Sequence, residues 1–188
     1  MHVDEIRHAP LVDGISGTYQ TLREMARIVR EDSTDLRVRA IAESIVSGCA
    51  GHEFECEVQA IFSYCRDAIT YRRDPIEQER IQDTLRTVHL FNSGDCDDKI
   101  VCLAGLLGSL GHKSRFVIIG PRAEKFTHVY LEVQTKGGWL PLDPTPEQAP
   151  MGWEARALHR DVYEIWGNET GSLVGLLALG ALAYWWLK

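Results

Sequence analysis

The sequence predicts an α+β protein in which helices come first and an antiparallel sheet follows. Two observations carry this prediction. Up to Leu110 the apolar residues recur at intervals of three or four, which is typical of amphipathic helices. After Gly111 the period changes to two, and glycine and proline separate short runs rich in valine and isoleucine, which is typical of strands.

Composition indicates a globular protein, apart from the C-terminal residues. The chain has 188 residues and a formal net charge of −7, and this acidity argues against nucleic acid as the main partner. The five cysteines are odd in number and irregularly spaced, so they do not suggest a disulfide framework and suit a reducing compartment. Residues 1–10 are polar and show no signal peptide, so we expect synthesis in the cytoplasm.

Three helices are predicted before the centre of the chain, at residues 18–31, 36–47 and 53–69. A cluster of capping residues, 32–35, starts the second of them. Residues 1–17 are expected to be an arm, and residues 76–87 a polar connector on the surface.

A group of cysteines and one histidine around the third helix raises the alternative of a metal site. Cys49, His52, Cys56 and Cys65 are separated by three, four and nine residues, which matches no common zinc module. Cys65 also falls on the apolar stripe of its helix. We therefore expect buried or incidental thiols here, and neither a metal nor another cofactor.

Residues 91–110 place Cys96 where a loop becomes the first turn of a buried helix. Turn formers precede Cys96, and residues 100–110 are almost entirely apolar. The free N–H groups and the dipole at a helix N-terminus lower the pKa of a thiol, which favours a nucleophile. The alternative is that Cys96 is a small core residue.

Three aspartates, Asp95, Asp97 and Asp98, surround the same cysteine. Their negative charge opposes ionisation of the thiol, so a protonated histidine would be needed to hold the thiolate. The alternative is that these aspartates simply cap the helix.

Strands are predicted at residues 114–119, 127–134 and 139–142, and the last two would form a hairpin. If the turn is centred between Thr135 and Lys136, His128 lies opposite Asp143; a turn one residue later makes them diagonal neighbours. Such a pair can hold an imidazole in one tautomer. The alternative is a solvent-facing ion pair worth less than about 1 kcal/mol. His89 is a second possible base, which we rank below His128.

Cys96, His128 and Asp143 follow one order in which thiol hydrolases use a nucleophile, a base and an orienting acid. With their flanking residues they resemble the transglutaminase-like superfamily, whose members are related to papain. The resemblance covers about residues 53–146 and rests on four motifs: GDCDD (residues 94–98), LGHKSRFV (110–117), THVYLEV (127–133) and GWLPLDPT (138–145).

The resemblance implies a papain-like core and a catalytic triad without a cofactor. Cys96 would attack the carbonyl carbon of an amide, His128 would move the proton, and Asp143 would orient His128. An oxyanion hole would combine the Cys96 backbone N–H with a side-chain donor, for which Asn92 and Gln82 are both candidates.

The implied function is that of a peptidase or amidase that works through a thioester, acting on a peptide or amide such as a peptidoglycan peptide. Residues 74–83 resemble phage-associated members in particular, which raises association with a virion or prophage. Two alternatives stay open: a structural or assembly component of a phage particle with an idle triad, and an acyl transferase that accepts an amine.

The expected organisation has four parts. Residues 1–50 would form an N-terminal helical arm, 51–150 the transglutaminase-like catalytic core, 151–170 a C-terminal extension and 171–188 a hydrophobic helix. Residues 172–187 carry no charge and would form a helix about 25 Å long, slightly shorter than the roughly 30 Å hydrocarbon core of a bilayer. Membrane attachment and burial in a homo-oligomer or virion assembly are both open for this segment.

Overall fold

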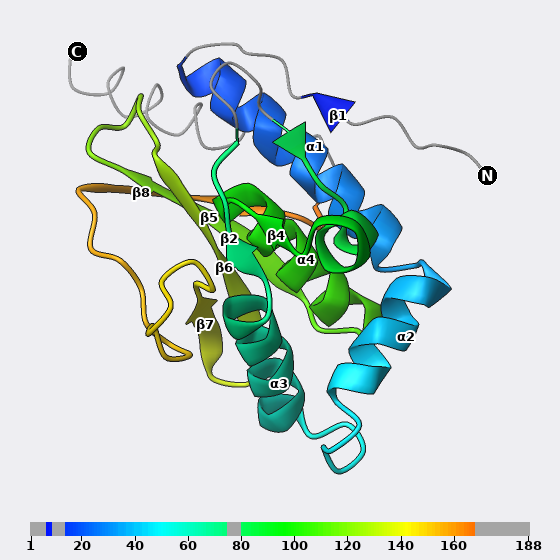
Figure 1. The fold of residues 1–188 in the computed structure, drawn as a ribbon. Coiled ribbons are helices and arrows are strands. Elements are labelled where there is room, and N and C mark those ends of the chain that lie inside the picture. The colour runs from blue at the N-terminus through cyan, green and yellow to red at the C-terminus, as the bar shows by residue number, and fades with distance from the viewer. Residues whose placement is uncertain (1–6, 9–13, 75–79, 168–188) are drawn as a thin grey trace, which may run out of the picture.

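The computed structural model describes residues 7–8, 14–74 and 80–167. Helices occupy the first part of this region and a four-stranded antiparallel sheet the second, which confirms the α+β class. Figure 1 shows the helices as one layer and the sheet as a second layer. One helix lies in the centre and contacts both the other helices and the sheet.

Within the described residues the α-helices are α1 (Ile15–Asp32), α2 (Leu36–Ile45), α3 (Phe54–Asp67) and α4 (Cys96–Ser109). The predicted helices are thus confirmed, with ends that differ by a few residues. The predicted capping cluster is also confirmed, because the Asp35 carboxylate accepts a hydrogen bond from the Arg37 N–H at the start of α2.

Helix α4 is the centre of the core. Its residues from Asp98 to Leu107 are all buried, and it packs against α1, α2 and α3 as well as against the sheet (Figure 1). Small residues permit this packing: a Cβ added at Gly105 would lie 2.5 Å from the Thr84 hydroxyl oxygen. The expectation of a buried central helix is therefore confirmed.

The sheet has the strand order β7-β6-β5-β8. Its strands are β5 (Ser114–Gly120), β6 (His128–Thr135), β7 (Gly138–Leu142) and β8 (His159–Glu164). The first three were predicted, whereas β8 was not. It is a mostly exposed edge strand with a polar sequence, so it lacks the apolar alternation that marks a strand.

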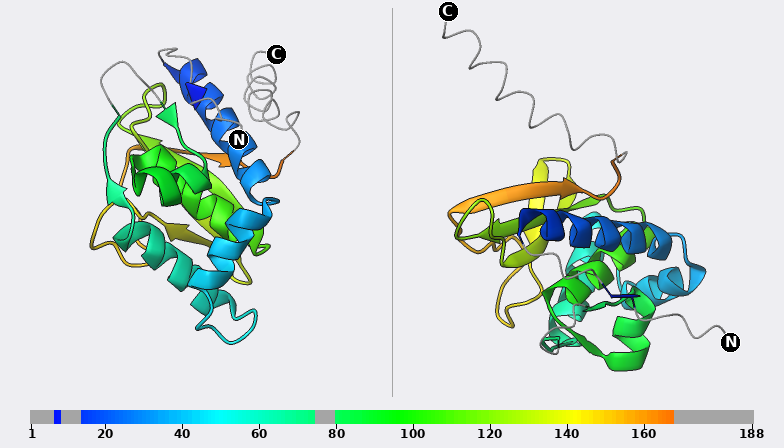
Figure 2. Two further views of the ribbon diagram at one scale, coloured as in Figure 1. Left: turned by 45° about the vertical axis from the view of Figure 1, so that its right-hand side comes forward. Right: turned by 90° about the horizontal axis from the view of Figure 1, so that it is seen from above.

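Strand β8 lies along the edge of the sheet beside α1 (Figure 2). The Tyr19 hydroxyl on α1 donates to the Asp161 carboxylate, and the Tyr163 ring contacts the Tyr19 ring. Near the other end of α1, Arg30 Nη1 donates to the Ile165 carbonyl oxygen at 2.9 Å. The region after the hairpin therefore belongs to the same packed unit.

The β6–β7 hairpin has its turn one residue later than the first of the two predicted registers. Thr135 pairs with Gly138 and Leu131 with Leu142, so His128 and Asp143 are not directly opposite. Gly138 has φ +132°, a conformation that side chains rarely adopt, and this favours the later turn. Strand β7 ends at Leu142, and Asp143 follows it directly.

Two short ladders and a helical turn hold the chain before α4. β1 (Arg7–His8) pairs with β3 (Arg80–Ile81), and β2 (Thr70–Tyr71) pairs in parallel with β4 (Ser93–Gly94). Residues Arg86–Phe91 form a π-helical turn, η1. The prediction of a mere surface connector is wrong for residues 80–87, because Ile81, Thr84 and Thr87 are buried.

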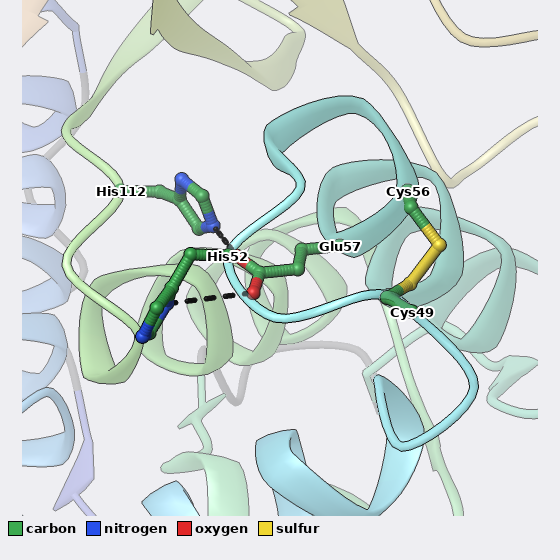
Figure 3. Close-up of a disulfide and its surroundings, with 5 residues drawn as sticks. All are labelled: Cys49, His52, Cys56, Glu57 and His112. Atoms are coloured by element: carbon green, nitrogen blue, oxygen red, sulfur yellow. Dashed lines mark hydrogen bonds and ion pairs between the residues drawn. A yellow bond between two sulfur atoms is a disulfide. The ribbon is translucent and has the colours of Figure 1, made fainter.

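Cys49 and Cys56 form a disulfide that links the middle of the α2–α3 loop to the first turn of α3 (Figure 3). The expectation of free thiols is therefore wrong for this pair, although Cys65 is a buried free thiol as expected. An odd number of cysteines does not exclude a disulfide between two of them that are close in sequence. Disulfides are typical of oxidising compartments, so the cysteines no longer support a reducing one.

None of the helices in the described ranges is long and apolar enough to cross a membrane. The uncharged stretch 172–187 lies outside the described residues.

Candidate active site

The first turn of α4 is closed by a capping box. The Asp95 carboxylate accepts hydrogen bonds from the N–H groups of Asp97 (3.1 Å) and Asp98 (3.4 Å), and the Asp98 carboxylate accepts one from the Asp95 N–H (3.3 Å). Gly94 is required here, since an added Cβ would lie 2.4 Å from the Asp98 Cβ. The GDCDD motif thus fixes the position at which the helix begins.

Cys96 is the first residue of α4 and is partly buried. Its Sγ donates to the Asp97 carboxylate at 3.4 Å. Burial, followed by the charges of Asp97 and Asp95, raises the pKa of the thiol far above its ordinary value. The isolated thiol is therefore protonated at neutral pH, and any nucleophilic role needs a base that removes the proton.

His128 begins β6, and its Nε2 lies 2.7 Å from Asp143 Oδ2. The Asp143 side chain is completely buried, whereas that of His128 is 22% exposed. Asp143 is held in turn by the Thr145 N–H, which donates to its Oδ1 at 3.0 Å. The pair is therefore not the solvent-facing ion pair considered as the alternative.

This bond determines the roles of the two ring nitrogens of His128. A carboxylate oxygen only accepts, so Nε2 carries the proton that is shared with Asp143. In the neutral ring the lone pair is then on Nδ1, which is the atom available as a base. Helix α4, which begins with Cys96, packs against β6, which begins with His128. That the thiol faces Nδ1 stays a prediction.

Of the two candidate oxyanion donors, Asn92 directly precedes β4 and Gln82 is hydrogen-bonded to it. Asn92 is exposed in a left-handed conformation (φ +47°) at the end of η1. Gln82 is partly buried, and its Nε2 donates to the Asp98 carboxylate and, at 3.3 Å, to the Ser93 carbonyl oxygen. Both Gln82 contacts lie at the start of α4. His89, the second possible base, is exposed on η1.

Sequence reasoning missed Lys99 and did not foresee that Asp98 is buried. Lys99 is 2% exposed and donates from Nζ to the carbonyl oxygens of Ile69 (2.9 Å) and Arg66 (3.2 Å) at the end of α3. Burial lowers the pKa of Lys99. Asp98 is fully buried and accepts from the Gln82 backbone N–H at 2.7 Å. The only sequence signal was a charged triplet, residues 97–99, entering an apolar helix.

Within the described residues, one group could bring three metal-ligating atoms together. The ligand atoms of Asp95, Cys96 and Asp97 lie within 4.8 Å of one another. The Asp95 carboxylate already accepts a hydrogen bond at the helix start, and the Asp97 carboxylate accepts one from the thiol. The cluster is therefore explained by capping.

Comparison with known families decides which group this geometry belongs to. The model of the transglutaminase-like superfamily matches residues 39–144, which is more than half of the chain. The chain belongs to the transglutaminase-like superfamily. The matched range contains the three residues that sequence analysis selected, and the papain-like α+β core expected for this superfamily is the fold observed. No curated protein matches the chain.

Solved structures share the fold of this transglutaminase-like protein at low sequence identity. A candidate protease from Parabacteroides distasonis is 14% identical with a TM-score of 0.57; the match covers 79% of this chain and 30% of that one. LapG from Legionella pneumophila is 14% identical with a TM-score of 0.51, and the match covers 91% and 96% of the two chains. For a candidate cysteine protease from Cytophaga hutchinsonii the values are 14% and 0.45, with coverage of 71% and 55%.

The protein thus spans about a third of the Parabacteroides chain and about half of the Cytophaga chain. At these identities the Parabacteroides and Legionella structures establish the fold alone.

Proposed function

We propose that the protein is a cysteine hydrolase that cleaves amide bonds in peptides through a thioester on Cys96. The observation that carries this proposal is the 2.7 Å bond between His128 and the fully buried Asp143 carboxylate. A buried carboxylate bonded to one ring nitrogen orients the other and stabilises the imidazolium that forms during catalysis. The helix that begins with Cys96 packs against the strand that carries this histidine.

In the proposed reaction His128 Nδ1 takes the proton of the Cys96 thiol as the sulfur attacks the carbonyl carbon. The C–N bond then breaks, and His128 returns the proton to the leaving amine. Water attacks the resulting thioester, which releases a carboxylic acid and the thiol. The imidazolium offsets the burial and the aspartate charges that keep the resting thiol protonated. The Cys96 N–H, with Gln82 or Asn92, would bind the oxyanion.

A test of the nucleophile uses a peptide that carries a thiol-reactive vinyl sulfone in place of the scissile amide. The wild-type protein is expected to be labelled once, and Cys96→Ala is expected to remain unlabelled. Cys65→Ala is the matched control, because it removes a buried thiol outside the site and should leave labelling intact. Turnover of a peptide amide by Cys96→Ala would contradict the mechanism.

The role of Asp143 gives a second prediction. Asp143→Asn keeps the size of the side chain but removes the negative charge beside His128, so kcat/KM should fall by roughly 10²- to 10⁴-fold. The measurement is peptide hydrolysis, with Glu147→Gln, an exposed carboxylate on the same segment, as the control. A folded Asp143→Asn protein with the wild-type rate would exclude the orienting role.

A second candidate function is that of a structural or assembly component with an idle triad, including one in a virion. The raised pKa of Cys96 and its bond to Asp97 favour this candidate, because both stabilise an unreactive thiol. The vinyl sulfone experiment separates the two. A protein whose Cys96 stays unlabelled across the neutral pH range would support the scaffold. Transfer of the acyl group to an added amine would support the acyl transferase.

A further inference from the structure

A pocket of about 430 Å³ opens beside the segment that leads into Cys96. Its charged lining residues are four arginines and one aspartate: Arg72, Arg73, Arg80, Arg86 and Asp74. This excess of positive charge is unexpected in a chain whose net charge is −7. A concave site lined by one sign of charge concentrates ligands of the opposite sign.

The part of the pocket lining that contains Arg72 and Arg73 follows β2, and the parallel β2–β4 ladder attaches it to the chain just before Cys96. Tyr71 on β2 pairs with Gly94 on β4, and the Arg72 N–H donates to the Gly94 carbonyl oxygen at 2.8 Å. Gly94 itself lines the pocket and precedes Cys96 by two residues. Arg72 and Arg73 are therefore carried by a backbone that is hydrogen-bonded to the entrance of α4.

The lining segment that contains Arg80 is attached to α4 and β4 by Gln82. The Gln82 N–H donates to Asp98 Oδ1 at 2.7 Å, and the Gln82 side-chain amide donates to the Ser93 carbonyl oxygen at 3.3 Å. This places the segment that contains Arg80 next to β4. Arginines from two separate segments thus converge on the chain just upstream of the nucleophile.

Among the described residues, Arg72 and Arg73 have no acidic partner that balances their charges. Both residues are exposed, and within the described parts of the chain neither side chain forms an ion pair or a hydrogen bond. Asp74, the acidic residue of the lining, accepts a hydrogen bond from the Arg80 backbone N–H. Arg86 contacts Asp83 at 3.4 Å, so its charge is already partly balanced.

We propose that this pocket is a substrate subsite, in which Arg72 and Arg73 bind the side-chain carboxylate of an acidic residue close to the scissile amide. The proposal rests on the proposed function and adds a substrate class to it. Guanidinium groups bind carboxylates through paired, charge-assisted hydrogen bonds. The pocket would also offset the repulsion that Asp95, Asp97 and the overall negative charge exert on an acidic peptide.

The test is a binding measurement that needs no catalysis, so its failure is distinct from failure of the hydrolase proposal. The full chain with Cys96→Ala is titrated with three fluorescein-labelled peptides. One is an amidated peptide that contains three glutamates, the second replaces these with glutamines, and the third contains glutamines but ends in a free carboxylate. The same titrations are repeated after Arg72→Gln and Arg73→Gln are added together. Arg23→Gln, an exposed arginine on α1, is the matched control.

The glutamate peptide is expected to bind at least tenfold more tightly than the glutamine peptide, and added salt should reduce the difference. The Arg72→Gln/Arg73→Gln protein should lose most of this preference, while Arg23→Gln keeps it. Equal binding of all peptides would overturn the proposal, as would a preference that survives in the Arg72→Gln/Arg73→Gln protein. A preference for the free terminal carboxylate alone would also overturn it.

A second readout connects the subsite to catalysis. The wild-type protein is assayed with internally quenched octapeptides in which one position at a time is glutamate or glutamine. The kcat/KM ratio of glutamate to glutamine is expected to exceed ten at one position and to approach one in the Arg72→Gln/Arg73→Gln protein. A ratio near one at every position of peptides that are cleaved would refute the subsite and leave the hydrolase intact.

Discussion

The thiol of Cys96 is held in its protonated form by its neighbour in sequence. The Asp97 carboxylate accepts the hydrogen bond from Sγ and is, after burial, the largest contributor to the raised pKa of the thiol. Asp97→Asn should therefore lower this pKa and speed alkylation by iodoacetamide at a fixed neutral pH. Rates are compared with those of Glu55→Gln, which removes an exposed acid from α3. A slower reaction in Asp97→Asn would contradict the electrostatic account.

Asp98 makes folding stability depend on pH. Burial, followed by the charge of Asp95, raises the pKa of Asp98 from 3.8 to about 7. Between these values the folded protein binds a proton that the unfolded chain has released. The stabilisation is fully present below about pH 4 and is lost as the pH rises through about 7, by an amount on the order of 4 kcal/mol.

The experiment measures the free energy of unfolding between about pH 4 and about pH 8 for the wild type and for Asp98→Asn. Asparagine retains an oxygen that can accept from the Gln82 N–H but does not titrate. The free energy of unfolding of the wild type minus that of Asp98→Asn is expected to decrease as the pH rises. Curves that stay parallel would show that Asp98 keeps an ordinary pKa in the folded protein.

The residues that carry the proposed chemistry could be selected from sequence because each sits in a short motif. Cys96 lies in GDCDD at a helix start, and His128 and Asp143 flank one hairpin. Their companions could not be selected in this way. The contact of Gln82 with Asp98 joins residues sixteen apart in the chain, and the buried Lys99 donates to carbonyls about thirty residues away. Such contacts depend on how the elements pack.

At the scale of elements, the disulfide connects the loop after α2 to the first turn of α3. Closing a loop of this size is expected to contribute about 2 kcal/mol, mainly by restricting the unfolded chain. Changing both Cys49 and Cys56 to serine should therefore lower the free energy of unfolding by about that amount in urea titrations. Wild-type protein with reductant should behave like the double variant. No effect of reductant on the wild-type midpoint would argue that the bond is absent.

Element boundaries were predicted where the apolar period was strong and were missed where it was weak. Helices α1, α2 and α3 each bury a stripe, and their apolar spacing identified them. Helix α4 is buried almost all round and was identified by its long apolar run. Strand β8 buries too little for its sequence to alternate, and the two-residue strands β2 and β4 are too short to show any period. The hairpin register depends on the backbone conformation of Gly138. The sequence pattern of the two strands does not determine that conformation.

At the scale of the whole molecule, the number of cysteine thiols that react with a reagent tests the fold. Cys65 and Cys102 are buried, Cys96 is partly exposed, and Cys49 and Cys56 are bonded to each other. A thiol reagent should therefore titrate one group in the native protein, three after denaturation in concentrated guanidinium chloride, and five once the denatured chain is also reduced. Five groups without reductant would exclude the disulfide. Three in the native state would exclude the tightly packed core around α4.

The two ends of α4 face different parts of the molecule. Cys96 forms its first residue, whereas Gly108 near its last turn packs so closely on Trp166 that an added Cβ would lie 3.2 Å from that ring. Gly108 lies twelve residues after Cys96 along the helix, which separates the two points by about 18 Å. Trp166 therefore packs against the end of α4 opposite Cys96. The packing at the Trp166 end of the helix can therefore vary without touching the first turn that holds the thiol.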